Sequence, residues 1–147
     1  TGMTTAKEID EIINFIDIRK SLKKIVLYSC TSSYPAKIED VKLLDILNLK
    51  KRYGKYIKAL GFSGHHNGIS IDNASISLGA SWIERHFTFD RSAKGTDHAA
   101  SLELEGLAKL RGRLDETNLA LQYKPKEILK NEIFQRKYLK KIVKLKT

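Results

Sequence analysis

Three short apolar runs, each too brief to form a buried helix, alternate along this chain with stretches of helical periodicity. Their β-branched and aromatic residues favour strands, which we expect at about 25–28, 57–63 and 82–87. Apolar residues at helical spacing predict helices at about 5–19, 38–54, 70–78 and 104–121, with another from about residue 128. This order of elements predicts parallel strands joined by right-handed helical crossovers.

The first two predicted helices have recognisable ends and faces. Thr5 and Glu8 have the spacing of a capping box, which would begin the first helix. Gly54 follows the second helix as its expected C-cap. One apolar stripe is expected along that helix, made of Ile38, Val41, Leu44 and Leu47.

Three parallel strands are few for an open sheet, whereas eight strands close into a barrel of about 250 residues. The chain has 147 residues, and its opening Thr1-Gly2-Met3 reads like the exit of a strand whose body is absent. We therefore expect an α/β fold that forms roughly half of a (β/α)8 TIM barrel. This part-barrel is expected to span residues 1–121, followed by a basic helical tail over residues 122–147.

The formal net charge of +10 is concentrated in that tail. We interpret the tail as a solvated helix face rather than a nucleic-acid surface, because a run of charges without a shaped binding site is usually a solvated face. The sequence has no apolar run of about 18 residues and no visible signal peptide, so no membrane association is expected. A single cysteine, Cys30, fits a reducing, cytoplasmic setting.

Polar side chains gather at the carboxyl ends of all three predicted strands, the edge where parallel α/β folds build their active sites. They are Thr31, Ser32 and Tyr34, then Ser63, His65 and His66, and finally Glu84 and His86. His65 and His86 stand at neighbouring strand ends and can converge on one divalent ion, because neutral imidazole binds first-row metals. Open coordination positions would remain for substrate and water.

Other kinds of chemistry have no support in the sequence. We find neither a G-x-x-x-x-G-K-[ST] phosphate loop nor a G-x-G-x-x-G fingerprint, and no G-x-S-x-G nucleophile elbow. Cys30 has no nucleophile motif around it and is expected to pack as a small buried residue.

Four ordered motifs stand out beyond these patterns. They are C-T-S-S-Y-P at 30–35, G-F-S-G-H-H at 61–66, L-G-A-S-W-I-E-R-H-F-T at 78–88 and K-G-T-D-H-A-A-S-L-E at 94–103. Together they resemble the N-acetylneuraminate (sialic acid) synthase family, in which E-[KR]-H-F-T is the most specific element. The resemblance covers about residues 1–121 and implies the C-terminal half of the family's barrel, strands six to eight.

Members of that family condense phosphoenolpyruvate with N-acetylmannosamine, its 6-phosphate or a related aldose, and they use a divalent ion. The resemblance implies that His65 and His86 are the catalytic metal ligands, with Mn²⁺ as the expected ion and Mg²⁺ or Co²⁺ as alternatives. It also implies substrate contacts for Ser32, Tyr34, Ser63 and Asp97. Hydroxyl side chains can donate hydrogen bonds to phosphate or carboxylate oxygens, which suits the two serines.

Each of the four substrate residues also has a plainer interpretation. Ser32 and Ser63 could satisfy loop backbone groups, as serines near turns often do. Tyr34 could be a packing residue, and Asp97 could cap a turn.

The neighbours of the histidine pair carry separate expectations. Glu84 shares a sheet face with His86 by alternation, and we expect it to satisfy the core rather than to orient the metal site. Arg85 is expected to point the other way, towards the helices. His66 and His98 are expected to lie at the surface.

The sequence also departs from the family it resembles. Many relatives read S-D-H where this chain has Ser63-Gly64-His65. The half-barrel that supplies phosphoenolpyruvate-binding lysines in relatives, and their antifreeze-like domain, are not in this sequence. We therefore expect the chain to pair with a complementary half-barrel or with itself, and to lack synthase activity alone.

Two other classes of function stay open at this point. One is a metal-dependent sugar-phosphate aldolase or isomerase on a related barrel. The other is a non-catalytic module whose basic tail binds an acidic partner.

Overall fold

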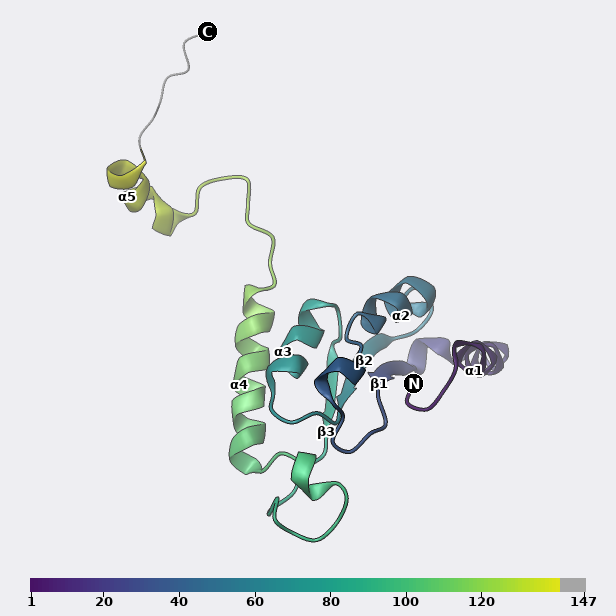
Figure 1. Cartoon of the computed structure of the whole chain (residues 1–147). Helices are drawn as coiled ribbons and strands as arrows, with labels where there is room; N and C mark the ends of the chain where they lie inside the picture. The colour runs from purple at the N-terminus through teal and green to yellow at the C-terminus, as the bar shows by residue number, and fades with distance from the viewer. Residues whose placement is uncertain (141–147) are drawn as a thin grey trace.

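The structure is a computed structural model that describes residues 1–140, so the predicted helical tail lies partly outside the described residues, over 141–147. The helices are α1 (Ala6–Ile18), α2 (Asp45–Tyr53), α3 (Ser70–Ser77), α4 (Leu104–Ala120) and α5 (Lys130–Leu139). The strands are β1 (Val26–Cys30), β2 (Ala59–Gly64) and β3 (Trp82–Arg85). Short 3-10 turns are η1 (Leu22–Lys24), η2 (Ile38–Asp40) and η3 (His98–Ala100). The predicted alternation of helices and strands is confirmed (Figure 1).

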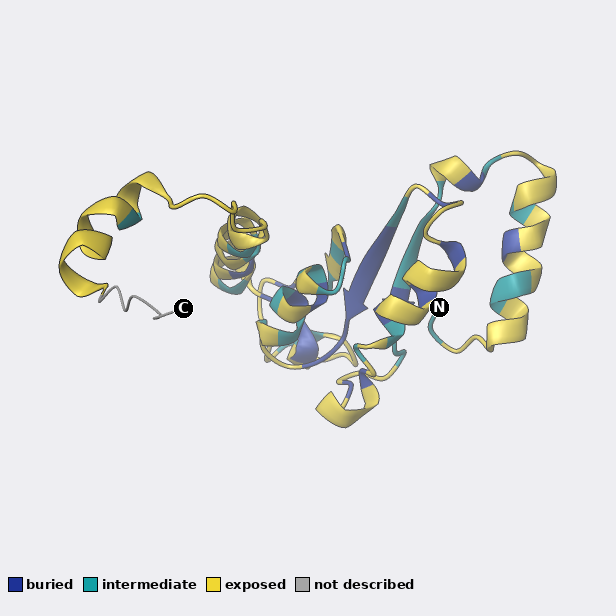
Figure 2. Cartoon of the chain, turned by 90° about the horizontal axis from the view of Figure 1, so that it is seen from above, coloured by how far each residue is buried: buried dark blue, intermediate teal, exposed yellow. Residues whose placement is uncertain are grey.

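The three strands form one parallel sheet in the order β1-β2-β3. The register places Ser63 of β2 opposite Cys30 of β1 on one side and opposite Glu84 of β3 on the other. The central strand β2 is buried along almost its whole length (Figure 2). Because all three strands run the same way, their carboxyl ends meet at one edge of the sheet.

The hydrophobic core lies on the face of the sheet that the helices cover. Leu60 and Phe62 of β2 pack there in one buried cluster with Ile46 and Leu49 of α2. From α1, Ile13 joins the same cluster. Alternation along the strands sends the intervening side chains to the opposite face.

The first helix is stabilised by an N-terminal cap and by hydrogen bonds to α2. The predicted capping box is confirmed, with the Thr5 side chain and the Glu8 carboxylate bonding reciprocally to backbone N–H groups. Asp10 accepts hydrogen bonds from Tyr53 and from Arg52 of α2, each at 2.6 Å. The Tyr53 hydroxyl, together with the neighbouring guanidinium, holds the pKa of the Asp10 carboxyl below its usual value.

The opposite face of the sheet has a tight contact between two strands. Gly61 has no side chain, and the aromatic ring of Tyr28 on β1 packs over it. A Cβ atom added at Gly61 would lie only 2.5 Å from the nearest atoms of that ring. Any larger residue at 61 would therefore displace that ring. Burial raises the pKa of Tyr28, and the negative charge of Glu84 raises it further.

The apolar stripe predicted for the second helix is wrong. Of its members only Val41 is buried, whereas Ile38, Leu44 and Leu47 are exposed. The helix breaks because Lys42 adopts a φ of +50°, so the chain forms η2 first and starts α2 only at Asp45. The buried face of α2 is instead made of Ile46, Leu49 and Tyr53.

Three strand boundaries also differ by two residues from their predictions, and the first is that β1 runs on to Cys30. β2 begins at Ala59, two residues later than expected, and Ile57 packs into the core just before it. β3 ends at Arg85, so His86 stands just beyond the strand. Phe87 then forms an isolated parallel bridge with Leu102, which closes the long loop between them.

The C-terminal helices differ in how they attach to the sheet. α4 lies alongside α3, where Thr117 donates a 2.9 Å hydrogen bond to Asn73 (Figure 1). α5 lies beyond the end of α4 and away from the sheet, with Phe134 and Tyr138 exposed. None of the helices within residues 1–140 is long and apolar enough to cross a membrane.

The corrected face of α2 generates a test with a built-in control. Ile46→Ala is expected to lower the free energy of unfolding by about 2–5 kcal/mol, because a fully buried side chain would leave a cavity. Leu47→Ala, next to it but 43% exposed, is expected to change that free energy by only about 0.5 kcal/mol. Urea unfolding followed by circular dichroism measures both. Equal losses in the two variants would contradict the assigned face.

Candidate functional site

Three rings cluster at the carboxyl edge of the sheet. His65 follows β2 and His86 follows β3, and their ring centroids lie 5.0 Å apart. Tyr34, from the loop after β1, contacts both imidazoles, with its ring centroid 4.5 Å from that of His65 and 5.7 Å from that of His86. The structure therefore brings together the two predicted metal ligands and one predicted substrate residue.

The imidazole of His65 is held by the backbone of β1's following loop. Its Nδ1 lies 2.9 Å from the carbonyl oxygen of Thr31. A carbonyl can only accept a hydrogen bond, so Nδ1 carries a proton, and in the neutral ring Nε2 is then the nitrogen with the lone pair. This is the arrangement that metal-binding histidines commonly have, with the second ring nitrogen fixed by a backbone carbonyl.

Ser63 and Glu84, each two residues before one of the histidines, form a hydrogen-bonded pair. The Ser63 hydroxyl donates a 2.8 Å hydrogen bond to Oε1 of Glu84, across the register of β2 and β3. The expectation that Glu84 satisfies the core is therefore wrong, because its side chain is exposed on the face that the helices do not cover. Ser63 bonds to this carboxylate and not to the loop backbone.

Ser32 lies on the β1 side of the cluster. Its hydroxyl oxygen is 3.8 Å from the sulfur of Cys30, which is itself 4.0 Å from Nδ1 of His65. Cys30 is half-buried rather than fully packed, and it faces the candidate site. Gly2 passes so close that a Cβ atom there would overlap the Ser32 hydroxyl.

Asp97 reaches the cluster from the loop between β3 and α4. Its Oδ2 lies 3.8 Å from Nδ1 of His86, and its side chain is half exposed. The carboxylate does not cap the η3 turn that it precedes. His98 contributes to holding this loop, since its Nδ1 lies 2.7 Å from the Thr88 hydroxyl. His98 is half-buried, whereas a surface position was expected.

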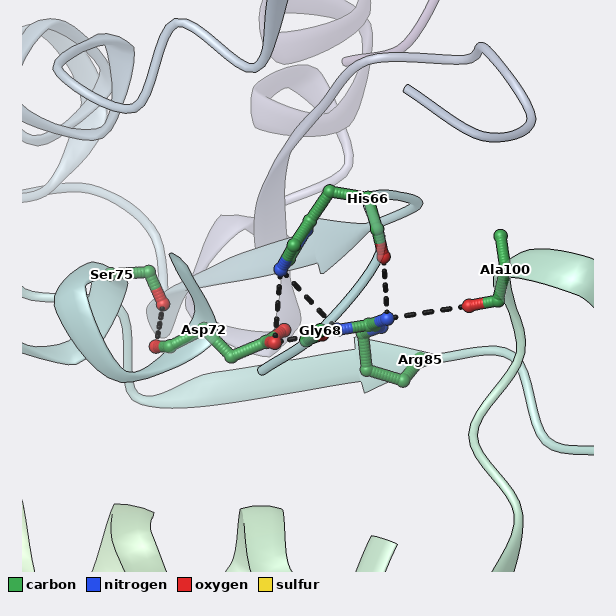
Figure 3. Close-up of polar contacts among 6 residues, drawn as sticks. All are labelled: His66, Gly68, Asp72, Ser75, Arg85 and Ala100. Carbon is green, nitrogen blue, oxygen red and sulfur yellow. Dashed lines mark hydrogen bonds and ion pairs between the residues drawn. The ribbon is translucent and has the colours of Figure 1, made fainter. Parts of the chain in front are cut away.

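A buried polar network lies behind the histidine pair, on the helix side of the sheet (Figure 3). His66 is completely buried, which contradicts its expected surface position. Its Nε2 lies 3.3 Å from Oδ2 of Asp72 on α3, and the same oxygen accepts a 2.6 Å hydrogen bond from Arg85. The prediction that Arg85 points towards the helices is confirmed. Asp72 was not singled out from the sequence, because nothing local distinguishes it from other helical aspartates.

The donor set at the carboxyl edge suits a metal ion bound by two protein ligands. Within the part of the chain that the structure describes, no group of three or more His, Cys, Asp or Glu side chains could hold an ion. Two neutral imidazoles alone would leave more coordination positions open than the three protein ligands of a typical catalytic zinc site. His65 and His86 thus fit an ion that also binds oxygen atoms of a ligand.

Parallel strands with helical crossovers, and a polar site at their carboxyl ends, are the arrangement of α/β enzymes, in barrels and in open sheets alike. The model of the NeuB family matches residues 1–126 of this sequence. The chain belongs to the NeuB family, which confirms the predicted resemblance to sialic acid synthases.

The chain is similar to several named members of this group. It is 39% identical to the N-acetylneuraminate-9-phosphate synthase of Drosophila melanogaster over 88% of this chain and 34% of the relative. It is 35% identical to the N,N'-diacetyllegionaminic acid synthase of Campylobacter jejuni over 90% of this chain and 39% of the relative. It thus spans little more than a third of the length of these curated relatives.

A solved structure supports the fold directly. The N-acetylneuraminic acid synthetase of Leptospira borgpetersenii superposes with a TM-score of 0.77 at 33% identity. The superposition covers 94% of this chain and 48% of that one. The predicted part-barrel fold is confirmed.

The Thr31 contact predicts the tautomer of His65. We expect the Nδ1–H form, because Nδ1 faces a carbonyl that can only accept. Long-range ¹H–¹⁵N correlation spectra of the chain at neutral pH, without added metal, distinguish the two ring nitrogens. A protonated Nε2 on neutral His65 would contradict the geometry. His98, whose Nδ1 faces a hydroxyl that can donate or accept, carries no such constraint and serves as the comparison.

Proposed function

We propose that this chain forms the metal-binding side of the active site of a nonulosonic acid synthase. The reaction is the condensation of phosphoenolpyruvate with an N-acetylated aldose such as N-acetylmannosamine. A C–C bond forms between C3 of phosphoenolpyruvate and the aldehyde carbon. Water then adds at C2, and the C2–O bond breaks to release phosphate. The product class agrees with the names of the relatives, which make sialic and legionaminic acids.

One observation carries the proposal: the imidazoles of His65 and His86, on neighbouring strand ends, lie together with Tyr34 at the edge where barrel enzymes bind substrate. We propose that the two histidines bind a divalent ion, with Mn²⁺ preferred. A bound ion would supply Lewis acidity to a carbonyl oxygen. The Thr31 carbonyl keeps Nε2 of His65 free for this role by accepting a hydrogen bond from Nδ1–H.

Ser63 and Ser32 are proposed to bind phosphoenolpyruvate, and Asp97 is proposed to bind the sugar. Ser63 sits deepest, and it would turn its hydroxyl hydrogen away from Glu84 and towards an anionic oxygen of phosphoenolpyruvate. Ser32 would donate to the same anion from the β1 side. Asp97 reaches the site from a surface loop near His86, where its carboxylate can accept hydrogen bonds from sugar hydroxyls.

Phosphoenolpyruvate also needs positive charge, and the site offers little of it. Arg85, the basic residue nearest to His86 along the chain, is directed to Asp72 and the helices. α5, which carries Lys130 and Lys137, lies away from the sheet (Figure 1). We therefore propose that a second polypeptide segment supplies the cations, as a complementary half-barrel docked against the open sheet edges. Exposed apolar side chains on α1, Ile12, Phe15 and Ile18, are available for such an interface.

Metal binding can be tested on the chain by itself. Isothermal titration with Mn²⁺ or Co²⁺ is expected to show one site. Loss of a residue that only orients a metal ligand typically weakens binding about 10- to 100-fold. His65→Gln and His86→Gln each remove a ligand and should weaken binding by more than that. His98→Gln removes an imidazole outside the pair and should leave the affinity nearly unchanged. Binding that survives in both ligand variants would contradict the assigned pair.

The synthase proposal predicts activity by complementation. The chain is expected to be inactive alone and to gain activity when mixed with the N-terminal half-barrel of a relative, such as the Campylobacter jejuni synthase. The thiobarbituric acid assay detects the nonulosonic acid product, and light scattering on a sizing column reports whether the halves associate. The mixture made with His86→Gln is the control and should give no product.

Two outcomes would contradict this part of the proposal. Clear product from the chain alone would show that no complementary half is needed. A stable complex of the two halves that binds metal but gives no product with any N-acetylated aldose would argue against the condensation itself.

A further inference from the structure

Arg85 makes an unusual number of contacts for a side chain that is only 2% exposed. Its NH1 group donates to Oδ2 of Asp72 at 2.6 Å and to the carbonyl oxygen of Gly68 at 2.8 Å. Its NH2 group donates to the carbonyl oxygens of His66 at 2.8 Å and of Ala100 at 3.4 Å (Figure 3). One planar guanidinium thus binds a helix, a turn and a loop at once.

These partners belong to the segments that carry the candidate site. His66 and Gly68 lie in the turn that begins with His65. Ala100 ends η3, the turn that starts one residue after Asp97. Arg85 itself precedes His86. The guanidinium therefore joins the three segments on which both imidazoles and the Asp97 carboxylate depend.

The end of β2 is packed tightly against this network. A Cβ atom at Gly64 would lie 3.0 Å from Oδ1 of Asp72 and 3.0 Å from the ring of His66. The end of β2 and the network are therefore in close contact. Movement at Asp72 or Arg85 would therefore be passed to His65, which directly follows Gly64.

Stability alone is a weak reason for such a network. Burying a charged pair costs desolvation, and apolar residues of similar volume often serve stability as well or better. Within residues 1–140, the buried side-chain atoms that lack a hydrogen-bond partner are Nδ1 of His66, Oδ1 of Asp72 and Nε of Arg85. All three belong to this one network, and unsatisfied buried groups concentrate where a structure serves something other than stability.

We propose that Arg85 is a positioning residue, which sets the relative placement of His65, His86 and the Asp97 loop through its contacts with Asp72 and the three carbonyls. It does not touch substrate or metal, because its side chain points to the opposite face of the sheet from Glu84 and the imidazole pair. The inference deepens the proposed function, since the site that it positions is the proposed metal site. Its geometry can nevertheless be tested without any metal.

The test uses the full chain and a matched pair of double variants. Asp72→Asn/Arg85→Met removes both buried charges together, so that neither is left unpaired. Asp10→Asn/Arg52→Met removes the exposed pair between α1 and α2 in the same way and serves as the control. The first measurement is the nuclear Overhauser effect between the ring protons of His65, His86 and Tyr34. The second is Co²⁺ affinity, read from the visible absorption of the bound ion.

We expect the Asp72→Asn/Arg85→Met variant to stay folded, to lose the His65–His86 ring contact and to bind Co²⁺ about 10- to 100-fold more weakly. The control should keep both properties. Retention of the ring contacts and of Co²⁺ affinity within about twofold in the network variant would overturn the proposal. If the wild-type chain binds no Co²⁺, the proposed metal site fails, and the ring contacts alone decide the positioning role.

A second variant keeps the test decisive if the double variant does not fold. Arg85→Lys keeps a charge beside Asp72, as in relatives with lysine at this place of E-[KR]-H-F-T, but it cannot hold three carbonyls in one plane, so it should weaken Co²⁺ binding by about three- to tenfold, less than the double variant. Its ring contacts should weaken as well. Unfolding of both variants would show a purely structural role and would overturn the proposal.

Discussion

Parallel hydrogen bonding on both edges of β2 determines where the residues of the candidate site lie. It aligns Ser63 with Cys30 and Glu84, and it carries His65 and the residues after β1 and β3 to a single edge. Side chains that are far apart in sequence meet there because parallel strands all end at the same edge of the sheet. The site is thus a product of register first and of residue chemistry second.

Alternation along β3 gives its last residues two different tasks. Glu84 faces the open side of the sheet beside Ser63, whereas Arg85 faces the helices and Asp72. His86 follows and returns to the open side. One short strand therefore supplies the site and also the contact that fastens the strand to its surroundings, and a shift of one residue in register would exchange these roles.

The sequence was a good guide where local pattern and strand order decide the outcome. The convergence of His65 and His86 follows from their place at neighbouring strand ends. It was a poor guide where a single backbone conformation or a distant partner decides. The positive φ of Lys42 interrupts the helix on which the predicted apolar stripe depended. His66 is buried because Asp72 and Arg85, which are distant in sequence, supply polar partners for its imidazole. The role of each site residue remains a prediction, since geometry brings them together without showing what they bind.

The ring of Tyr28 lying across Gly61 has a consequence for any ligand of this edge. It occupies the space directly below the row of Cys30, Ser63 and Glu84, so it forms a floor beneath the site. A molecule bound over β2 would reach the Ser63 hydroxyl before it meets this ring. Ligand size must therefore be accommodated sideways and outwards, towards the loops. Residues that select among ligands would accordingly be sought in the loops rather than in the sheet.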